Sequence, residues 1–301
     1  MAAYQKYILE IGGNVLVEQT EGNNNSLILK ISAKPQQIVA GAKAAEPPVP
    51  EGYRKVDVGS QEEFVIERIS DGSRFVWIPA EKLDADGTLD GVNFVEKFGR
   101  RNFQSHPFSN VGFHEQLEGD LAEQVRSIRK YGGFYYSAFN ISKSEAGNPV
   151  SVQGAEPWTN LTYAKARQIA ASFEDSESVS SHLPFGAEYD TVLAWFLQSG
   201  AKTLAQVARD SSNWGNHWDT LDGHRYITKT GSREAWAVHQ IYDQAGNVDE
   251  WTQERHGESG HVCRGSSYMD EGKYYPVAFR HYTGLNSNSE NTGFRIALCL
   301  K

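Results

Sequence analysis

The sequence predicts an α+β fold in which helices are bracketed by strands. Three segments, 116–130, 162–175 and 187–198, carry apolar residues at the spacing of one helix face. The segments around them hold short apolar, β-branched and aromatic runs bounded by turn-forming residues, which is the pattern of strands. Helices bracketed by strands in this way indicate an α+β domain. The chain of 301 residues is long enough for one large domain with an appendage, or for two domains.

Residues 1–38 predict a small β unit. Apolar or β-branched runs at 7–9, 15–17 and 27–31 are separated by segments rich in glycine and asparagine, which predict turns. Three short strands form a sheet that is too small to be stable alone. We therefore expect this unit to be an anchor that pairs with copies of itself or docks on a partner; the alternative is a frayed extension.

Residues 39–52 predict a linker, because an alanine-rich stretch runs into a proline-rich one. Pro47, Pro48 and Pro50 favour extended polyproline geometry and stiffen the segment. The expected order is therefore a small β anchor, a semi-rigid arm and a head domain over residues 53–301.

The head domain begins with two predicted strands, 63–67 and 74–79. The acidic segment 84–91 starts like an EF-hand loop, but Val95 stands where such a loop has its bidentate glutamate. We therefore expect a solvated turn there and not a calcium loop.

A long polar loop is expected after the third helix, which Gly200 is placed to end. Residues 210–235 are polar and contain glycines, with tryptophans in and next to them. Loops of this length are usually functional or fastened by other means, and a bound cation is one such means.

The turn around Gly246 concentrates oxygen ligands. Asp243 and Glu250 are hard oxygen donors, and a glycine turn between them can point backbone carbonyls inward. This suits Ca²⁺, which takes about six to eight oxygens and tolerates irregular geometry. On residue types alone, a tight turn whose acids cap backbone N–H groups is the preferred interpretation.

Three motifs follow one another from this turn: G-N-V-D-E-W at 246–251, R-G-S-S-Y at 264–268 and G-F-R at 293–295. Their order resembles the formylglycine-generating (sulfatase-modifying factor) family, which has a divergent C-type-lectin-like fold. The likeness covers about 76–301. Upstream it includes an early strand, a helix entry and a loop before the next helix, at 133–136, 157–164 and 181–189.

The resemblance implies a calcium site. In that family the ion is held by the residue four before the motif asparagine, by two backbone carbonyls and by the motif glutamate. These positions fall on Asp243, Gly246, Val248 and Glu250. Asp243 stands where the family often has asparagine, a change that should not weaken a Ca²⁺ site.

The cysteines indicate that the chain is not an enzyme of this family. The family's enzymes use two closely spaced cysteines and copper between the second and third motifs, but residues 269–282 contain no cysteine. Cys263 and Cys299 lie outside that interval, in apolar strand contexts where cysteine is usually a small buried hydrophobe. An oxidoreductase with displaced cysteines is the catalytic alternative.

The histidines do not indicate a metal centre. Non-haem iron relatives of this fold use a histidine-rich partner domain, whereas the nine histidines here are dispersed and show no H-x-x-x-H spacing. We expect His217, His239 and His281 to be surface or structural residues.

The segment 264–293 predicts recognition loops. Half of its 30 residues are tyrosine, serine, asparagine or glycine, the composition of antibody contact loops. A turn-rich terminal sheet is the alternative. The segment also resembles the retroelement-diversified variable proteins and related phage receptor-binding proteins of the same fold. The expected contact residues are Tyr268, Asp270, Lys273, Tyr274, Tyr275, Phe279, His281, Tyr282, Asn286, Asn288 and Asn291.

Composition limits the partners. A net charge of −9 argues against nucleic acid and anionic membranes, which need a basic surface. The sequence has neither a membrane-length apolar run nor a signal-peptide start. Together with the order of anchor, linker and head, these features agree with what the resemblance to phage receptor-binding proteins implies: a phage virion protein, made in the host cytoplasm, that binds a host cell-surface protein or glycan. Residues 1–50 would contact other virion proteins, and a homo-trimer is the expected assembly. A virion decoration protein without a ligand is the structural alternative.

Overall fold

The computed structural model describes residues 46–59, 63–80, 113–114, 120–221, 223–256, 260–284 and 286–301, together with three strands nearer the N-terminus. Contacts within the chain divide it into two units, Met1–Glu46 and Pro47–Lys301. Several predicted features lie outside the described residues: the N-terminal turns, 39–45 of the expected linker, the turn at 84–91 and residues 116–119 of the first helix.

The first unit is a three-stranded antiparallel sheet in the order β1-β2-β3. Its strands are β1 (Tyr7–Glu10), β2 (Val15–Glu21) and β3 (Leu27–Ala33). They lie where the sequence predicts them.

The second unit is built from short strands and a few helices. The helical segments are α3 (Asp120–Tyr131), α4 (Tyr163–Ala171), α5 (Gly186–Gln198), α6 (Leu204–Ala208) and the 3₁₀ turn η2 (Glu234–Trp236). The strands are β4 (Tyr53–Val56), β5 (Val65–Arg68), β6 (Arg74–Pro79), β7 (Phe113–His114), β8 (Gly133–Ser137), β9 (Ser142–Lys143), β10 (Pro149–Val150), β11 (Val179–His182), β12 (Ala237–Val238), β13 (Ile241–Tyr242), β14 (Asp249–His256), β15 (Gly260–Arg264), β16 (His281–Gly284), β17 (Thr292–Phe294) and β18 (Ala297–Leu300). Each helix in the described part of the chain is too short or too polar to cross a bilayer.

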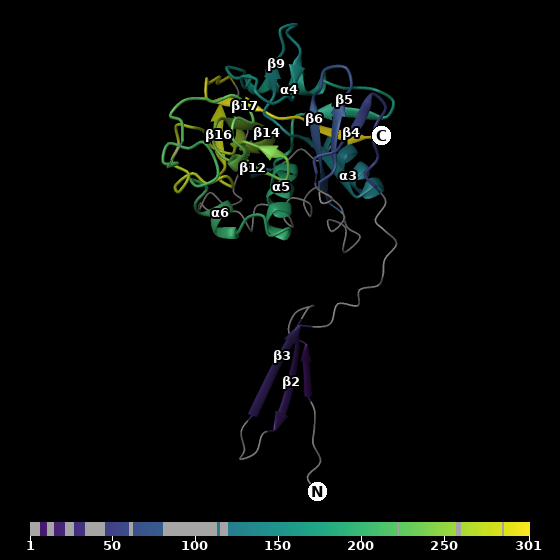
Figure 1. The fold of residues 1–301 in the computed structure, drawn as a ribbon, viewed down its shortest axis with the longest axis vertical. Coiled ribbons are helices and arrows are strands. Elements are labelled where there is room, and N and C mark those ends of the chain that lie inside the picture. Colours follow the sequence, from purple (N-terminus) through teal and green to yellow (C-terminus); the bar gives the residue numbers. More distant parts are fainter. Residues whose placement is uncertain are drawn as a thin grey trace. The chain divides into compact units, whose positions relative to one another are not determined.

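The larger sheet of this unit is antiparallel and has six strands, in the order β11-β18-β8-β6-β5-β4; β4, β5 and β6 lie on the right of the unit in Figure 1. Successive side chains of a strand point to opposite faces, and both faces of this sheet are buried. On β6, Val76 and Ile78 belong to the same apolar cluster as α3 and α5, whereas Phe75 and Trp77 belong to the cluster of α4. Helices therefore cover the sheet on both sides.

A second sheet, in the order β16-β15-β14-β17, carries the three motifs (Figure 1). β14 begins directly after the Gly246 turn and pairs antiparallel with β15 and parallel with β17. The strand predicted at 264–268 ends at Arg264, because Gly265 and Ser266 have φ of +92° and +62° and leave the strand conformation. The residues after Arg264 therefore form a turn.

The helices begin and end as local signals direct. Thr162 caps α4, and Gly200, with φ +76°, follows α5 as the predicted stop. α4 ends at Ala171, four residues before the predicted end. The sequence did not predict α6, whose N-cap Thr203 forms a capping box with Gln206.

Residues 47–52 of the expected linker belong to the second unit. The Tyr135 hydroxyl donates to the Pro48 carbonyl at 2.8 Å, Tyr53 N–H donates to the Pro50 carbonyl at 3.2 Å, and Pro50 is buried. A deletion intended to remove only the first unit should therefore stop before residue 46.

Candidate recognition surface and cation sites

The Gly246 turn is held against another segment of backbone. Gly246 has φ +73° and forms an isolated parallel bridge with Asn216. A Cβ on Gly246 would lie 2.4 Å from the Asn216 carbonyl oxygen, so only glycine fits. The Gly246 carbonyl accepts the Val248 N–H at 2.9 Å, which closes a tight turn immediately before β14.

The side chain of Asn247 fastens the long loop before the turn. Its Oδ1 accepts from the Thr228 N–H at 2.9 Å and from Asn216 Nδ2 at 3.2 Å, and its Nδ2 donates to the Thr228 carbonyl at 3.2 Å. Among the described residues, no helix or strand occurs between α6 and η2, as predicted. A side-chain amide therefore fastens this loop, a role for which the sequence had suggested a cation.

Glu250, one of the predicted calcium ligands, is buried and already has partners. Its Oε1 accepts from Arg295 Nε at 2.6 Å and from Asn140 Nδ2 at 2.7 Å. Its Oε2 lies 3.5 Å from the Tyr136 hydroxyl and from Gln244 Nε2. Burial raises the pKa of Glu250, although Arg295 acts in the opposite direction. The guanidinium supplies part of the positive charge that a calcium ion would bring.

Asp243, the other predicted carboxylate ligand, is less well compensated. Its Oδ2 accepts from the Gly231 N–H at 2.7 Å, but its Oδ1 has no hydrogen-bond partner among the described residues. The side-chain oxygens of Asn140 and Gln244, whose amide nitrogens face Glu250, also lack one. Burial raises the pKa of Asp243 to about 6. Buried oxygens without donors beside a carboxylate fit a hard cation such as Ca²⁺.

Four buried charged side chains join α5 and β14 to the segment after β15. Asp190 of α5 accepts from Arg264 at 2.7 Å and also from Arg280. Glu254 of β14 accepts from Arg280 Nε at 3.1 Å and lies 3.8 Å from Arg264. Two carboxylates thus alternate with two guanidiniums, and the segment between Arg264 and Arg280 is fixed at both ends.

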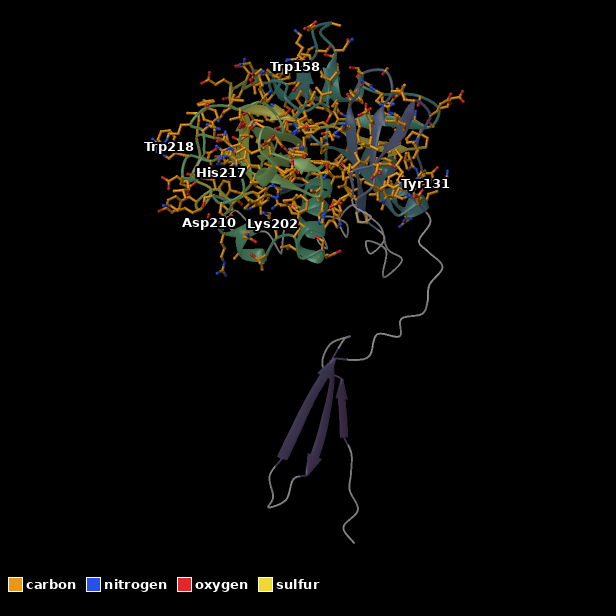
Figure 2. The ribbon with its side chains drawn as sticks, in the orientation of Figure 1. Tyr131, Trp158, Lys202, Asp210, His217 and Trp218 are labelled. Carbon is orange, nitrogen blue, oxygen red and sulfur yellow. The ribbon has the colours of Figure 1, made fainter. Side chains whose placement is uncertain are left out.

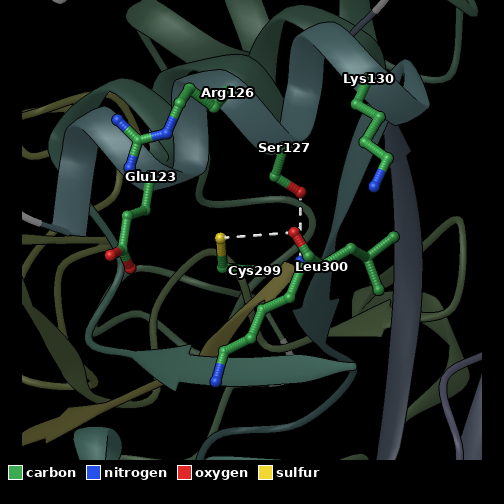
Figure 3. A pocket seen from close by; sticks show the side chains of 7 residues that line it. Glu123, Arg126, Ser127, Lys130, Cys299 and Leu300 are labelled. Atoms are coloured by element: carbon green, nitrogen blue, oxygen red, sulfur yellow. Dashed lines mark hydrogen bonds between the residues drawn. The ribbon is translucent and has the colours of Figure 1, made fainter. Parts of the chain in front are cut away.

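The two cysteines are free and lie on different sheets, Cys263 on β15 and Cys299 on β18. Burial raises the pKa of the Cys299 thiol to about 11 and that of Cys263 well above its usual value. Cys299 lines a pocket next to α3, together with Glu123, Arg126 and Lys130 (Figure 3). Neither thiol is disposed to ionise, as a nucleophile or copper ligand must.

Two of the three singled-out histidines have structural surroundings. His217 is fully buried, neither ring nitrogen has a hydrogen-bond partner among the described residues, and burial lowers its pKa to about 4. His239 stacks on Trp195 at 4.3 Å and contacts Glu63 Oε1 at 2.9 Å. Both agree with the structural roles predicted for them.

Most of the predicted contact residues reach the surface. Tyr274, Tyr282 and Tyr275 are 65%, 57% and 38% exposed. Lys273, Asn286 and Asn288 are exposed too, and the half-buried members are Tyr268, Asp270, His281 and Asn291. We call these residues, without Phe279, the tyrosine surface.

Phe279 is a correction to the predicted set, because it is only 8% exposed. Its ring packs edge-on against Tyr275 at 5.1 Å and against His281 at 4.8 Å, so it supports these rings from beneath. Asp270 and Asn291 also have internal partners. Asp270 Oδ2 accepts from the Ser267 N–H at 2.9 Å, and Asn291 Nδ2 donates to Ser267 Oγ at 3.2 Å.

The long loop adds Trp218 to this surface, which sequence reasoning missed. The Trp218 N–H donates to the Asp270 carbonyl at 2.9 Å, and Asp219 Oδ1 accepts from the Gly272 N–H at 2.7 Å. Trp218 is 44% exposed, projects at the edge of the head and lies 4.2 Å beneath the Arg225 guanidinium (Figure 2). A tryptophan in a polar, glycine-bearing loop was the available signal.

Comparison with known proteins finds one family and several solved structures with partial similarity. The family described as "Sulfatase-modifying factor enzyme 1-like domain" matches residues 93–300. No curated protein matches the chain. Among solved structures, PvdO from Pseudomonas aeruginosa is 15% identical with a TM-score of 0.42, over 56% of this chain and 82% of that one. Variable protein 1 of Treponema denticola is 14% identical with a TM-score of 0.43, over 82% of this chain and 99% of that one. CarF is 16% identical with a TM-score of 0.39, over 64% of this chain and 95% of that one.

Proposed function

The chain belongs to the family of sulfatase-modifying factor enzyme 1-like domains, and we propose that it is a non-catalytic member that binds a ligand on a host-cell surface. The family predicted from the sequence is confirmed. The sheet-rich architecture with few helices fits the C-type-lectin-like fold predicted with it. The phage and retroelement-diversified branch of the family is part of the proposal.

The tyrosine surface is the observation that carries this proposal. Three tyrosines, 274, 275 and 282, remain exposed, although a tyrosine side chain gains free energy when its apolar ring is buried. Tyr274 and Tyr275 stand on the segment that Arg264 and Arg280 fix at both ends. Tyr282 follows Arg280 on β16. The scaffold therefore sets the positions of all three before a ligand arrives. Preorganised aromatic side chains bind at a low entropic cost, which suits a recognition surface.

The thiols support a non-catalytic role. A formylglycine-type oxidase needs two cysteines at one copper ion, whereas Cys263 and Cys299 lie buried on different sheets with raised pKa values. Copper titration of the purified protein, followed by thiol oxidation, tests this part. Tight copper binding that engages both thiols would overturn it.

Replacing Tyr274, Tyr275 and Tyr282 together by alanine should reduce ligand binding by about 100-fold or more, because central aromatic residues carry most of the energy of an interface. The measurement is binding of the labelled full-length chain to bacterial cells and to a glycan array. The two formats distinguish a protein receptor from a sugar.

Ile69→Ala is the matched control, since Ile69 is also an exposed apolar side chain but lies between β5 and β6. It should bind like the wild type. Equal binding by the triple alanine variant would contradict the proposal, provided that its circular dichroism and thermal midpoint match those of the wild type.

We extend the proposal to the first unit, as an anchor to a phage virion that assembles as a homo-trimer. A chain lacking residues 1–45 keeps Pro48 and Pro50 in place and should therefore fold. It should run as a monomer in light scattering and fail to enter particles. A truncated chain that remains trimeric, or that still enters particles, would remove the anchor from the proposal.

We also propose that Asp243, Glu250 and the carbonyls of Gly246 and Val248 hold a calcium ion, supported by the unpartnered Oδ1 of Asp243. Adding Ca²⁺ to metal-free protein should raise its thermal midpoint. When the free calcium concentration is 100 times Kd, the free energy of unfolding should rise by about 2.7 kcal/mol. Asp243→Ala should abolish the gain. Asp57→Ala is the control, because this exposed aspartate caps the Gly59 N–H much as Asp243 caps that of Gly231. An equal calcium response in all three proteins would reject this site.

A further inference from the structure

Buried carboxylates of the second unit differ in how well they are compensated. Glu250 has Arg295, Asp190 and Glu254 share two arginines, and Glu188 accepts from the Phe185 N–H at 2.8 Å. Asp249, the first residue of β14, is only 6% exposed. Among the described side chains its carboxylate has a hydrogen-bond partner in His281, whose Nδ1 lies 3.4 Å from Oδ1. This is long for a hydrogen bond to a charged group, so Asp249 is a buried carboxylate with weak compensation.

A third ligand-type side chain completes the cluster. Atoms of Asp249, Asp270 and His281 that could each bind a metal all lie within 4.8 Å of one another. The three residues come from the start of β14, the turn after β15 and the start of β16. The convergence of separate segments on one buried carboxylate distinguishes this cluster from neighbouring acids on a surface loop.

Each member of the cluster is positioned by the scaffold. The Asp249 N–H donates to the Asn291 carbonyl at 2.8 Å, and the Asp270 carboxylate is held by the Ser267 N–H at 2.9 Å. The His281 ring packs against Tyr275 and Phe279, at centroid distances of 5.0 and 4.8 Å. The side chains therefore keep their approximate arrangement without an ion.

We propose that Asp249, Asp270 and His281 bind one divalent transition-metal ion of the zinc class. Ligand atoms bound to zinc at about 2.0–2.2 Å are closer together than 4.8 Å, so the cluster must contract by no more than a small side-chain movement. An imidazole nitrogen selects zinc, iron, nickel or copper over calcium and magnesium, which prefer oxygen alone. Asp270 and His281 are half-exposed, so water or a ligand atom can fill the remaining coordination positions.

This site is distinct from the proposed calcium site in ligands and in metal class. It also does not depend on the proposed recognition function, because metal binding is measured without a receptor. A zinc ion here would tie the turn after β15 to β14 and β16, next to Tyr275 of the tyrosine surface.

The test is calorimetric titration of Zn²⁺ into the EDTA-treated and dialysed full-length chain with excess Ca²⁺ present. It is combined with the visible absorption spectrum of the Co²⁺-substituted protein. The wild type should bind one Zn²⁺ ion saturably at the cluster. His281→Gln and Asp270→Asn should each weaken that binding by about tenfold or more, on the scale by which even supporting residues alter metal affinity. Both side chains are half-exposed and the replacements keep polar groups, so folding should survive, as thermal midpoints will show.

His224→Gln is the matched control, because His224 is also half-buried but contacts Arg233 outside the cluster. It should bind Zn²⁺ as the wild type does. The proposal is overturned if the wild type shows no saturable zinc binding, or if His281→Gln and Asp270→Asn bind as tightly as His224→Gln. It is also overturned if an anomalous-scattering map of zinc-soaked crystals places the ion elsewhere. In each of those cases, Asp249 and His281 are simply a hydrogen-bonded pair.

Discussion

Gly246→Ala should lower the free energy of unfolding by about 2–5 kcal/mol. About 1–2 kcal/mol of this comes from placing an alanine in the left-handed conformation that Gly246 adopts, with φ +73°. About 1–3 kcal/mol more comes from forcing a methyl group into packed structure. That methyl carbon would lie 2.4 Å from the carbonyl oxygen and 2.7 Å from the backbone nitrogen of Asn216, so the backbone itself must move.

The variant Gly154→Ala separates the conformational contribution from the steric one. Gly154 has φ +80°, but nothing lies within 4 Å of its ideal Cβ position. The control should therefore lose only the conformational term, about 1–2 kcal/mol. Urea denaturation with a common slope gives both values. If the two variants lose the same amount, the segment around Asn216 yields freely, and the Gly246 turn is not the rigid point that the structure indicates.

The fold could be predicted wherever neighbouring residues in the sequence carry the signal for a strand, a helix or a helix end. The strand of 74–79 and the helix of 187–198 appear at or within one residue of their predicted bounds, and Gly200 follows the helix as expected. α6 was missed because five residues are too few to show a helical period. The strand predicted at 264–268 stops at Arg264, since left-handed φ values at the next two residues cannot be read from residue types alone.

The candidate site was less predictable, because its contacts join residues far apart in the chain. Motif order identified the Gly246 turn, but Arg295, which pairs with Glu250, lies 45 residues later. Trp218 joins the tyrosine surface through a hydrogen bond to Asp270, which no local pattern foretells. Composition favoured contact roles for every aromatic residue of 264–293, yet Phe279 is buried beneath its neighbours. The sequence predicted His281 as a contact residue but not as a metal ligand, because Asp249 and Asp270 approach it only in the folded chain.

Arg295→Met should lower the free energy of unfolding by about 3–5 kcal/mol, the usual result when one partner of a buried ion pair is removed. Arg295 is fully buried and donates to Glu250 Oε1 at 2.6 Å. It also donates to the carbonyls of Ser137, at 3.1 Å, and of Tyr242. Methionine fills much of the volume but leaves the buried Glu250 carboxylate without its compensating guanidinium and these carbonyls without this donor. Urea denaturation at neutral pH measures the loss.

Two further variants show whether the loss of stability in Arg295→Met arises because the ion pair is buried. Arg54 forms a comparably short ion pair, 2.5 Å to Glu67, but its side chain is 66% exposed, so Arg54→Met should cost only about 0–1 kcal/mol. Glu250→Gln combined with Arg295→Met removes the stranded charge and should recover part of the lost stability. A double variant no more stable than Arg295→Met alone would instead assign the loss to the unpaired carbonyls. In that event Arg295 would act chiefly as a clamp between β8, β13 and the third motif, and the Glu250 carboxylate would need less compensation from either the guanidinium or a calcium ion.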